Sequence, residues 1–168
     1  MSNAKIEALF SGYCDPNGQA AFGSMVRVAG EVVYRNSSYC GYGPKMSLHV
    51  AEYLGAIDTL TEAVKYKGTI TLQGNSRMVI MQLGPDLTYG LERLKAKDGL
   101  YLPHYRKAVR IVNEHRERML FHWIPVHRNA ECHNLSKRAV LDRYPKLLAQ
   151  PRQTTSLRLL ETSVGSNS

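Results

Sequence analysis

The chain has 168 residues and a formal net charge of +8, with 43% hydrophobic and 21% charged residues. This composition is typical of one globular domain of ordinary size, and it excludes a membrane-spanning protein because no apolar run approaches the length of a membrane span. The three cysteines, Cys14, Cys40 and Cys132, lack the spacing of a zinc site or a disulfide framework. Together with the lack of a signal-peptide pattern, they predict a cytoplasmic protein.

Turn residues and apolar periodicity divide the chain into strands and helices. A hairpin turn at 29–31 joins two strand-like runs, and apolar residues spaced three and four apart indicate a long amphipathic helix. The Gly- and Ser-rich stretch 36–45 is expected to be a loop. In chain order, the sequence predicts strands at 6–10, 24–28 and 32–34, a helix at 46–65, a strand from 69, a helix ending at 83, a helix at 101–115, a strand at 119–123 and a helix at 129–144.

This order of elements predicts an α/β fold with a mixed five-stranded sheet. Three antiparallel strands come first, and parallel strands reached through helical crossovers follow them. Helices are expected to flank the sheet. We expect one domain over residues 1–145, followed by a polar, basic and flexible C-terminal tail over 146–168.

The positive charge is concentrated in two segments. Residues 93–118 have a balance of +5 and residues 137–168 a balance of +4, whereas the remainder of the chain is almost neutral. A localised basic surface suits a polyanion, so nucleic acid is the expected partner. The alternative is a solvated helix face on a basic protein.

Four segments of the chain carry recognisable motifs. They read FSGYCDPNGQAAFG from residue 10, VAEYLGAIDTL from residue 50, LQGNSRMVIMQL from residue 72 and HWIPVHRNAECHNLSKRA from residue 122. In this order and spacing they resemble the ribonuclease H family, from about residue 6 to residue 140. The resemblance implies the ribonuclease H-like fold and a relation to enzymes that cleave RNA in RNA–DNA hybrids.

The resemblance also identifies the positions at which the family carries its catalytic acids. Family enzymes use three aspartates and one glutamate to hold two Mg²⁺ ions beside the scissile phosphate. The corresponding residues here are Ser11, Glu52, Asn75 and His133, so only Glu52 remains a carboxylate. One carboxylate cannot offset the charge of two dications, and Mg²⁺ disfavours a histidine nitrogen. We therefore expect an inactive or strongly impaired site with no cofactor.

A metal site would require other residues of this chain as ligands, and the sequence offers two sets. Asp15 and Asp58 are further acids near these motifs, but their positions in a turn and around a helix do not suit them to replace the missing ligands. His49, Glu52 and His133 together would make an alternative site for a transition metal.

The resemblance assigns substrate contacts as well. The turn at 15–18 is retained, and its backbone can meet a 2′-hydroxyl group. Leu48 and His49 occupy positions where the family carries polar residues that touch the minor groove, and the basic residues before the next helix are suited to phosphate. The family often has a mobile histidine that assists product release, and His127 is the nearest match to it in this sequence. The alternative is that His127 is an ordinary surface histidine. The candidate nucleic-acid-binding residues are Asn17, Gly18, His49, Arg93, Lys95 and Lys97.

Three functions are compatible with these observations. The first is a catalytically inactive or impaired ribonuclease H-like domain that binds an RNA–DNA hybrid, a duplex or a structured RNA through its basic segments. The second is a protein-interaction or assembly module, including a homo-oligomer, that keeps only the fold. The third is an active ribonuclease H with an atypical site, which would use Mg²⁺ or Mn²⁺ with Glu52 as a ligand.

Overall fold

The computed structural model describes residues 3–85 and 99–143, so the candidate residues Arg93, Lys95 and Lys97 and the expected tail lie outside the described residues. The first part of the chain forms β1 (Ala4–Cys14), β2 (Gln19–Val28), β3 (Glu31–Tyr42), α1 (Leu48–Ala63), β4 (Gly68–Gly74) and α2 (Arg77–Leu83). The second part forms α4 (Leu102–Glu114), the 3₁₀ turn η1 (Arg116–Arg118), β5 (Met119–Trp123), the 3₁₀ turn η2 (Val126–Arg128) and α5 (Ala130–Arg143).

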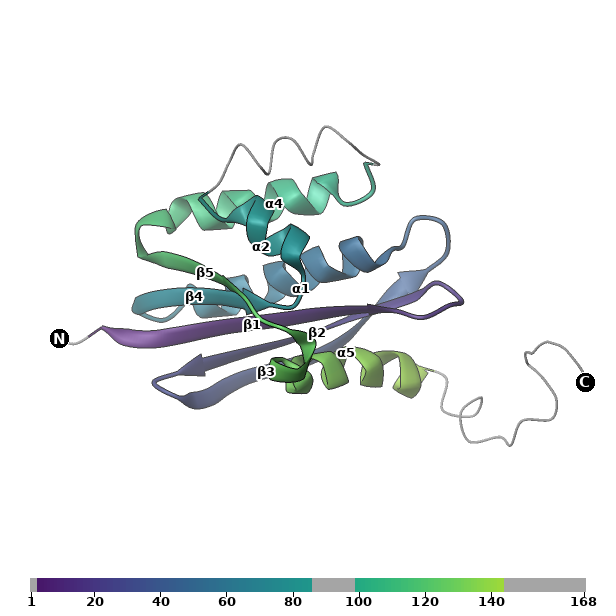
Figure 1. Cartoon of the computed structure of the whole chain (residues 1–168), viewed down its shortest axis with the longest axis horizontal. Coiled ribbons are helices and arrows are strands. Elements are labelled where there is room, and N and C mark those ends of the chain that lie inside the picture. The colour runs from purple at the N-terminus through teal and green to yellow at the C-terminus, as the bar shows by residue number, and fades with distance from the viewer. Residues whose placement is uncertain (1–2, 86–98, 144–168) are drawn as a thin grey trace, which may run out of the picture.

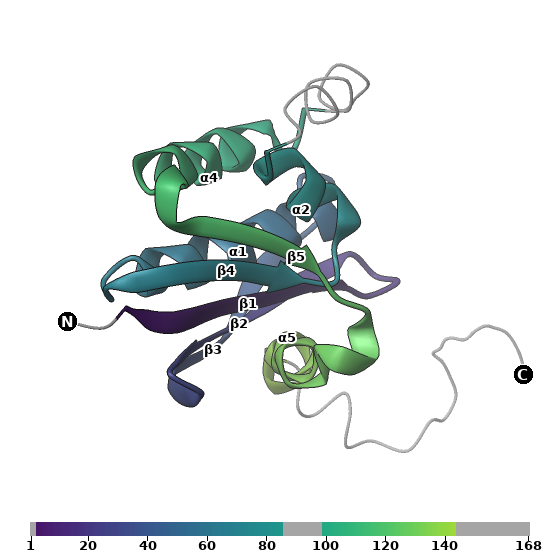
Figure 2. The ribbon, with the colours of Figure 1, turned by 60° about the vertical axis from the view of Figure 1, so that its left-hand side comes forward.

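The five strands form one mixed sheet in the order β3-β2-β1-β4-β5. β1 is antiparallel to β2, and β2 to β3, whereas β4 runs parallel to both β1 and β5. Helices α1, α2 and α4 cover one face of the sheet, and α5 covers the other (Figures 1 and 2). The predicted mixed five-stranded sheet, with three antiparallel strands followed by parallel ones and helices flanking it, is confirmed.

The stretch 36–45 differs from its prediction, because β3 continues to Tyr42 and only the rest of the stretch is a loop. Pairing with β2 decides this outcome: Gln19 of β2 lies opposite Tyr42, and the ladder runs to the start of the hairpin. The hairpin turn itself is confirmed. Ala29 and Gly30 have φ angles of 52° and 86°, the left-handed pair that matches the twist of antiparallel strands.

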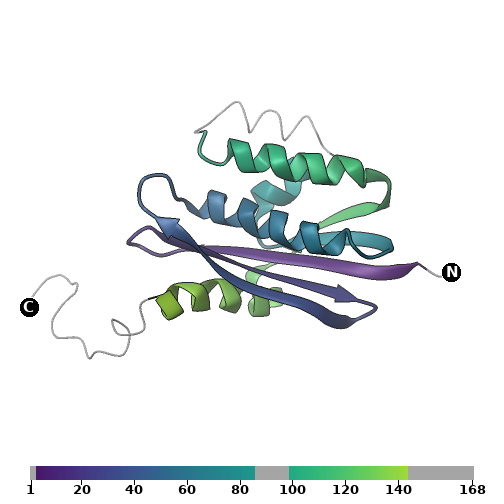
Figure 3. The same ribbon diagram turned by 180° about the vertical axis from the view of Figure 1, so that it is seen from behind.

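Helix α1 packs its apolar face against β1 and β2 and supports the main core (Figure 3). Ser47 caps the helix by accepting a hydrogen bond from the Val50 backbone N–H at 3.2 Å. Gly55 brings the helix close to the sheet, because a Cβ atom there would lie 3.1 Å from Cβ of Phe22. These features fix the height of α1 above the strands and, with it, the position of Glu52.

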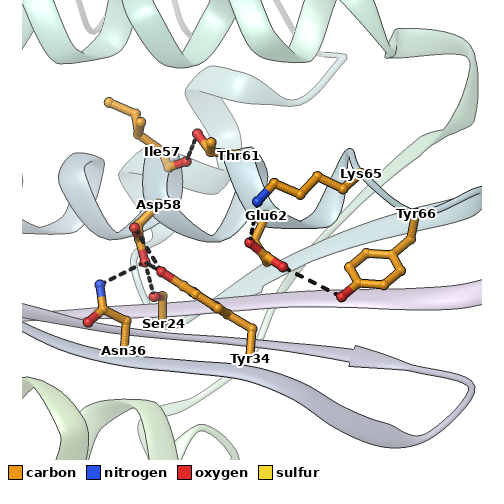
Figure 4. A network of polar contacts seen from close by, with 9 residues as sticks. All are labelled: Ser24, Tyr34, Asn36, Ile57, Asp58, Thr61, Glu62, Lys65 and Tyr66. Atoms are coloured by element: carbon orange, nitrogen blue, oxygen red, sulfur yellow. Dashed lines mark hydrogen bonds and ion pairs between the residues drawn. The ribbon is translucent and has the colours of Figure 1, made fainter.

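Two polar anchors hold α1 in place. In the middle of the helix, Asp58 accepts hydrogen bonds from Ser24 Oγ at 2.5 Å, Tyr34 Oη at 3.0 Å and Asn36 Nδ2 at 3.1 Å (Figure 4). Burial and the hydrogen bond to Asp58 raise the pKa of Tyr34 to about 12, which keeps this donor protonated.

The second anchor follows the end of α1. The Arg118 guanidinium donates to the backbone carbonyl groups of Val64, Tyr66 and Gly68 at 3.1, 2.8 and 2.8 Å. It therefore joins the segment before β5 to the connection between α1 and β4. A guanidinium satisfies several carbonyl groups at once because its N–H donors form a planar fork.

Candidate functional site

The four positions identified from the sequence gather at the carboxyl ends of β1 and β4. Phe10 pairs with Gly74 in the parallel register, so Ser11 and Asn75 continue two neighbouring strands at the same edge of the sheet. α1 brings Glu52 to this edge from one face, and α5 brings His133 from the other. In sheets of this kind, ligands bind at the carboxyl ends of the strands.

Ser11 and His133 form a direct hydrogen bond. Ser11 Oγ lies 3.2 Å from His133 Nδ1, and Ser11 is only 1% exposed. Burial, and then the positive charge of Lys137, lowers the pKa of His133. Where the family has a pair of acids, the chain therefore has a hydroxyl group bonded to an imidazole whose neutral form is favoured.

Glu52 is buried, with 6% exposure, and its Oε1 atom already has two protein partners. Ser76 Oγ donates to it at 2.9 Å, and His49 Nδ1 donates at 3.2 Å. Gly12 lies in close contact with Glu52, because a Cβ atom at position 12 would fall 2.7 Å from Glu52 Cγ and 2.8 Å from the Glu52 backbone nitrogen. The glycine lets α1 approach the end of β1 closely enough to place the carboxylate at the site.

Asn75 is tied to the start of α5 by Asn129. The Asn129 amide nitrogen donates to Asn75 Oδ1 at 2.8 Å and to the Phe10 carbonyl at 2.8 Å. Asn129 itself is 2% exposed, and among the described residues its Oδ1 is the one buried side-chain nitrogen or oxygen that lacks a partner. The sequence predicts Asn129 only as the start of a helix. The bridge has no signal there, because it depends on residues 54 and 119 positions away in the chain.

The donor set does not fit a pair of magnesium ions. It comprises a hydroxyl group, an amide oxygen, an imidazole and one carboxylate, which supplies a single negative charge. The alternative transition-metal site is wrong, because residues 3–85 and 99–143 contain no group of three His, Cys, Asp or Glu side chains that could hold a metal ion. His49 contacts Glu52, whereas His133 contacts Ser11.

The two remaining acids near the motifs have structural roles. Asp15 Oδ1 accepts hydrogen bonds from the backbone N–H groups of Asn17 and Gln19 at 2.9 and 2.8 Å, which closes the turn after β1. Asp58 belongs to the anchor of α1 described above. In this turn Asn17 is exposed and Gly18 has a φ angle of +83°. The contact of this turn with nucleic acid stays a prediction.

Cationic side chains border the site, and sequence reasoning did not single them out. Lys137 lies one helical turn after His133, with Nζ 6.0 Å from the centre of the Tyr13 ring. Arg77 follows Ser76 at the start of α2, and its Cζ atom lies 3.9 Å from the centre of the Trp123 ring. The spacing of four residues between His133 and Lys137 indicates that they share one face of α5, and it was the available signal that Lys137 lies near the site.

The predicted basic segment at 93–118 divides into two roles within its described part. Arg106, Lys107 and Arg110 are exposed on α4 and form a positive helix face. Arg116 instead donates to the Leu83 carbonyl, and Arg118 is the clamp on the connection after α1. Charge counting therefore overestimated the basic surface, because the sequence does not distinguish a solvated arginine from one that binds carbonyl groups.

His127 lies in η2, close to the start of α5, where it is exposed. Nothing in the described residues joins it to the buried site, so its proposed role in product release stays a prediction. Among the described helices, none has both the length and the apolar character needed to cross a membrane.

Comparison with solved structures identifies the fold. The N-terminal ribonuclease H domain of a Mycobacterium tuberculosis protein matches with a TM-score of 0.69 at 26% identity, over 88% of this chain and all of that domain. A ribonuclease H1 from Halobacterium salinarum matches with a TM-score of 0.66 at 22% identity, over 82% and 98% of the two chains.

A third match is a ribonuclease H1 isolated from compost, whose structure was also solved in complex with an RNA/DNA hybrid. It has a TM-score of 0.67 at 21% identity and covers 86% of this chain and 99% of that one. Comparisons with protein-family profiles and with curated protein sequences give no match. Strand order, helix placement and these three structures agree, and the chain has the ribonuclease H-like fold.

Proposed function

We propose that this ribonuclease H-like domain binds nucleic acid and has lost, or strongly reduced, the cleavage of RNA–DNA hybrids. The observation that carries the proposal is the composition of the site, where Glu52 is the one carboxylate among the four family positions. Its Oε1 atom is engaged by Ser76 and His49. Two-metal catalysis requires several carboxylates to hold the ions beside the phosphate, and this site lacks them.

Binding is supported by charge and by the retained turn. Arg106, Lys107 and Arg110 present a positive face on α4, and exposed cations of this kind bind phosphate groups without reading sequence. Asn17 and Gly18 keep the turn after β1 open to a nucleic-acid backbone. The structural relative from compost was solved with an RNA/DNA hybrid, which makes a hybrid the first ligand to test.

The second candidate function is an assembly module. Leu48 is 41% exposed and Tyr42 is 67% exposed, so apolar surface lies near the position where the family carries polar groove-contacting residues. Exposed apolar side chains favour a protein partner, including a second copy of the chain, over a nucleic-acid groove. Nucleic-acid affinity distinguishes the two functions.

We expect no cleavage of an RNA–DNA hybrid by the purified protein in Mg²⁺ or Mn²⁺, because one carboxylate cannot hold two dications. The measurement is a gel assay with an end-labelled hybrid, run beside Glu52→Ala protein purified in the same way. Cleavage that persists in the Glu52→Ala protein comes from a contaminating nuclease. Metal-dependent cleavage that disappears in that variant would show that the site is active.

We expect binding to a labelled duplex to weaken steeply with salt. On B-form DNA the slope of log K against log salt is about −0.9 for each phosphate neutralised. Replacing Arg106 and Lys107 by alanine should reduce the steepness of this slope, as should replacing Lys95 and Lys97. Lys67→Ala is the matched control, because Lys67 is exposed at the amino end of β4, away from the site. Binding that is absent at low salt would favour the assembly module.

A further inference from the structure

One side of the site is formed by a cluster of Tyr13, His133 and Lys137. The Tyr13 ring meets the His133 ring edge-on, with 6.2 Å between ring centres, and Lys137 Nζ lies 6.0 Å from the Tyr13 ring. Lys137 is exposed, and among the described residues no carboxylate lies within 4 Å of its ammonium group. Its charge therefore faces solvent beside the Ser11–His133 pair.

Arg77 provides a second cation next to the other half of the site. It is the first residue of α2, directly after Asn75 and Ser76, and its guanidinium stacks on Trp123 at 3.9 Å. A guanidinium held on an aromatic ring keeps its N–H donors at the ring edge for an anion. No carboxylate pairs with Arg77 in the part of the chain that the structure describes.

Hydrogen bonds connect the segments that carry these two cations through the site. Ser76 joins the start of α2 to Glu52, and Asn129 joins Asn75 to the start of α5. The backbone N–H of His133 donates to the Asn129 carbonyl at 3.0 Å, which places His133 and then Lys137 on the following turns. Arg77 and Lys137 therefore lie at the two ends of a chain of polar contacts that runs through the site.

This site carries much less negative charge than a metal centre built from four acids. A cluster of carboxylates repels a phosphate unless divalent cations lie between them. Here Glu52 is buried beside His49, and Asp15, near Tyr13, accepts hydrogen bonds from the backbone N–H groups of its own turn, whereas the charged groups of Lys137 and Arg77 reach solvent. A phosphate group is attracted to such a site without any metal.

We infer that the site binds a backbone phosphate of nucleic acid directly, with Lys137 and Arg77 taking the place that divalent cations have in the ribonuclease H family. This inference rests on the proposed function, because it assigns the nucleic acid to this surface. Guanidinium groups bind phosphate through paired N–H donors, and an ammonium group acts as a point charge. Tyr13 and His133 lie beside Lys137 and supply further polar atoms.

The first test is the effect of Mg²⁺ on binding. The affinity of the protein for a labelled RNA–DNA hybrid is measured by fluorescence anisotropy in EDTA and in millimolar Mg²⁺ at equal ionic strength. We expect full affinity in EDTA and equal or weaker affinity in Mg²⁺, because the cation competes for phosphate. Binding that requires Mg²⁺ would overturn the inference.

The second test removes the cations one at a time. Each of Lys137→Ala and Arg77→Ala should lower affinity for a B-form duplex by roughly eightfold at 0.1 M salt. With a slope of about −0.9, this is the factor by which one phosphate contact strengthens binding between about 1 M and 0.1 M salt. Lys137→Arg should retain affinity, and Lys67→Ala should have little effect. Melting curves check that the variants fold, as expected for exposed side chains.

The outcomes separate this inference from the proposed function. If the parent protein binds duplex and the Lys137→Ala and Arg77→Ala variants bind it as tightly as the Lys67→Ala variant does, the inference is overturned. The proposed function then still stands. Failure of the parent protein to bind any duplex at low salt would overturn both.

Discussion

Replacing Ser11, Asn75 and His133 together by aspartate is expected to give a protein that Mg²⁺ stabilises strongly. With Glu52, the variant has four carboxylates at positions that the described contacts bring together. In the absence of metal their mutual repulsion should lower the melting temperature near neutral pH, although Arg77 and Lys137 offset part of it. Mg²⁺ then binds the folded cluster and not the unfolded chain. At a concentration of about 100 times Kd this stabilises the protein by about 2.7 kcal/mol.

The measurement is the melting temperature of variant and parent, each with and without millimolar Mg²⁺. A matched control carries Ser11→Asn and His133→Asn, because these amides approximate the shape of the aspartates without their charge. We expect a rise of several degrees for the acidic variant, and little change for parent and control. Equal responses in all three proteins would mean that the four side chains do not converge on one ion.

Replacing Gly23 by alanine is expected to destabilise the fold by about 2–4 kcal/mol, at or above the usual cost of overpacking. A Cβ atom at this position would lie 2.2 Å from the Cys132 carbonyl oxygen, 2.7 Å from Leu135 Cβ and 2.9 Å from the Ser136 nitrogen. Two of these atoms belong to the backbone of α5, which cannot swing aside as a flexible side chain can. The helix has to move away from β2 and carry His133 away from Ser11.

Urea unfolding gives the free energy for this comparison, and Gly99→Ala is the control. At Gly99 the nearest atom to a new Cβ is Leu102 Cδ1 at 3.7 Å, an ordinary contact. The two substitutions add the same methyl group, so the difference between them reports the packing of α5 on β2. Similar stabilities would show that α5 tolerates displacement.

The fold was predictable because its main elements have strong local signals. The apolar positions of α1, among them Val50, Tyr53, Ile57 and Leu60, repeat at helical spacing and are buried in the structure. The length of β3 was not predictable in this way. Most of its residues after Asn36 are small, and they form a strand because β2 offers a ladder of partners. A strand that depends on its neighbour leaves a weak pattern in its own sequence.

The convergence of the four family positions was predictable, but the contacts around them were not. Resemblance to a family located Ser11, Glu52, Asn75 and His133, and the structure places them around one end of the sheet. The bridge from Asn129 to Asn75 and the cation of Lys137 beside Tyr13 depend on side-chain rotamers and on residues more than fifty positions apart. Local sequence patterns carry no information about such pairs.

The anchors of α1 imply that the site spans two units of different local stability. α1 is held by Asp58 in its middle and by Arg118 after its end, and it rests on the large apolar cluster, so its amide protons should exchange with solvent only when the whole domain unfolds. α5 covers two much smaller clusters, so we expect it to detach at a lower free energy than global unfolding while the sheet and α1 stay folded. We therefore expect slow amide exchange around Glu52 and faster exchange around His133, with the Ser11–His133 contact opening more often than the Glu52–Ser76 contact.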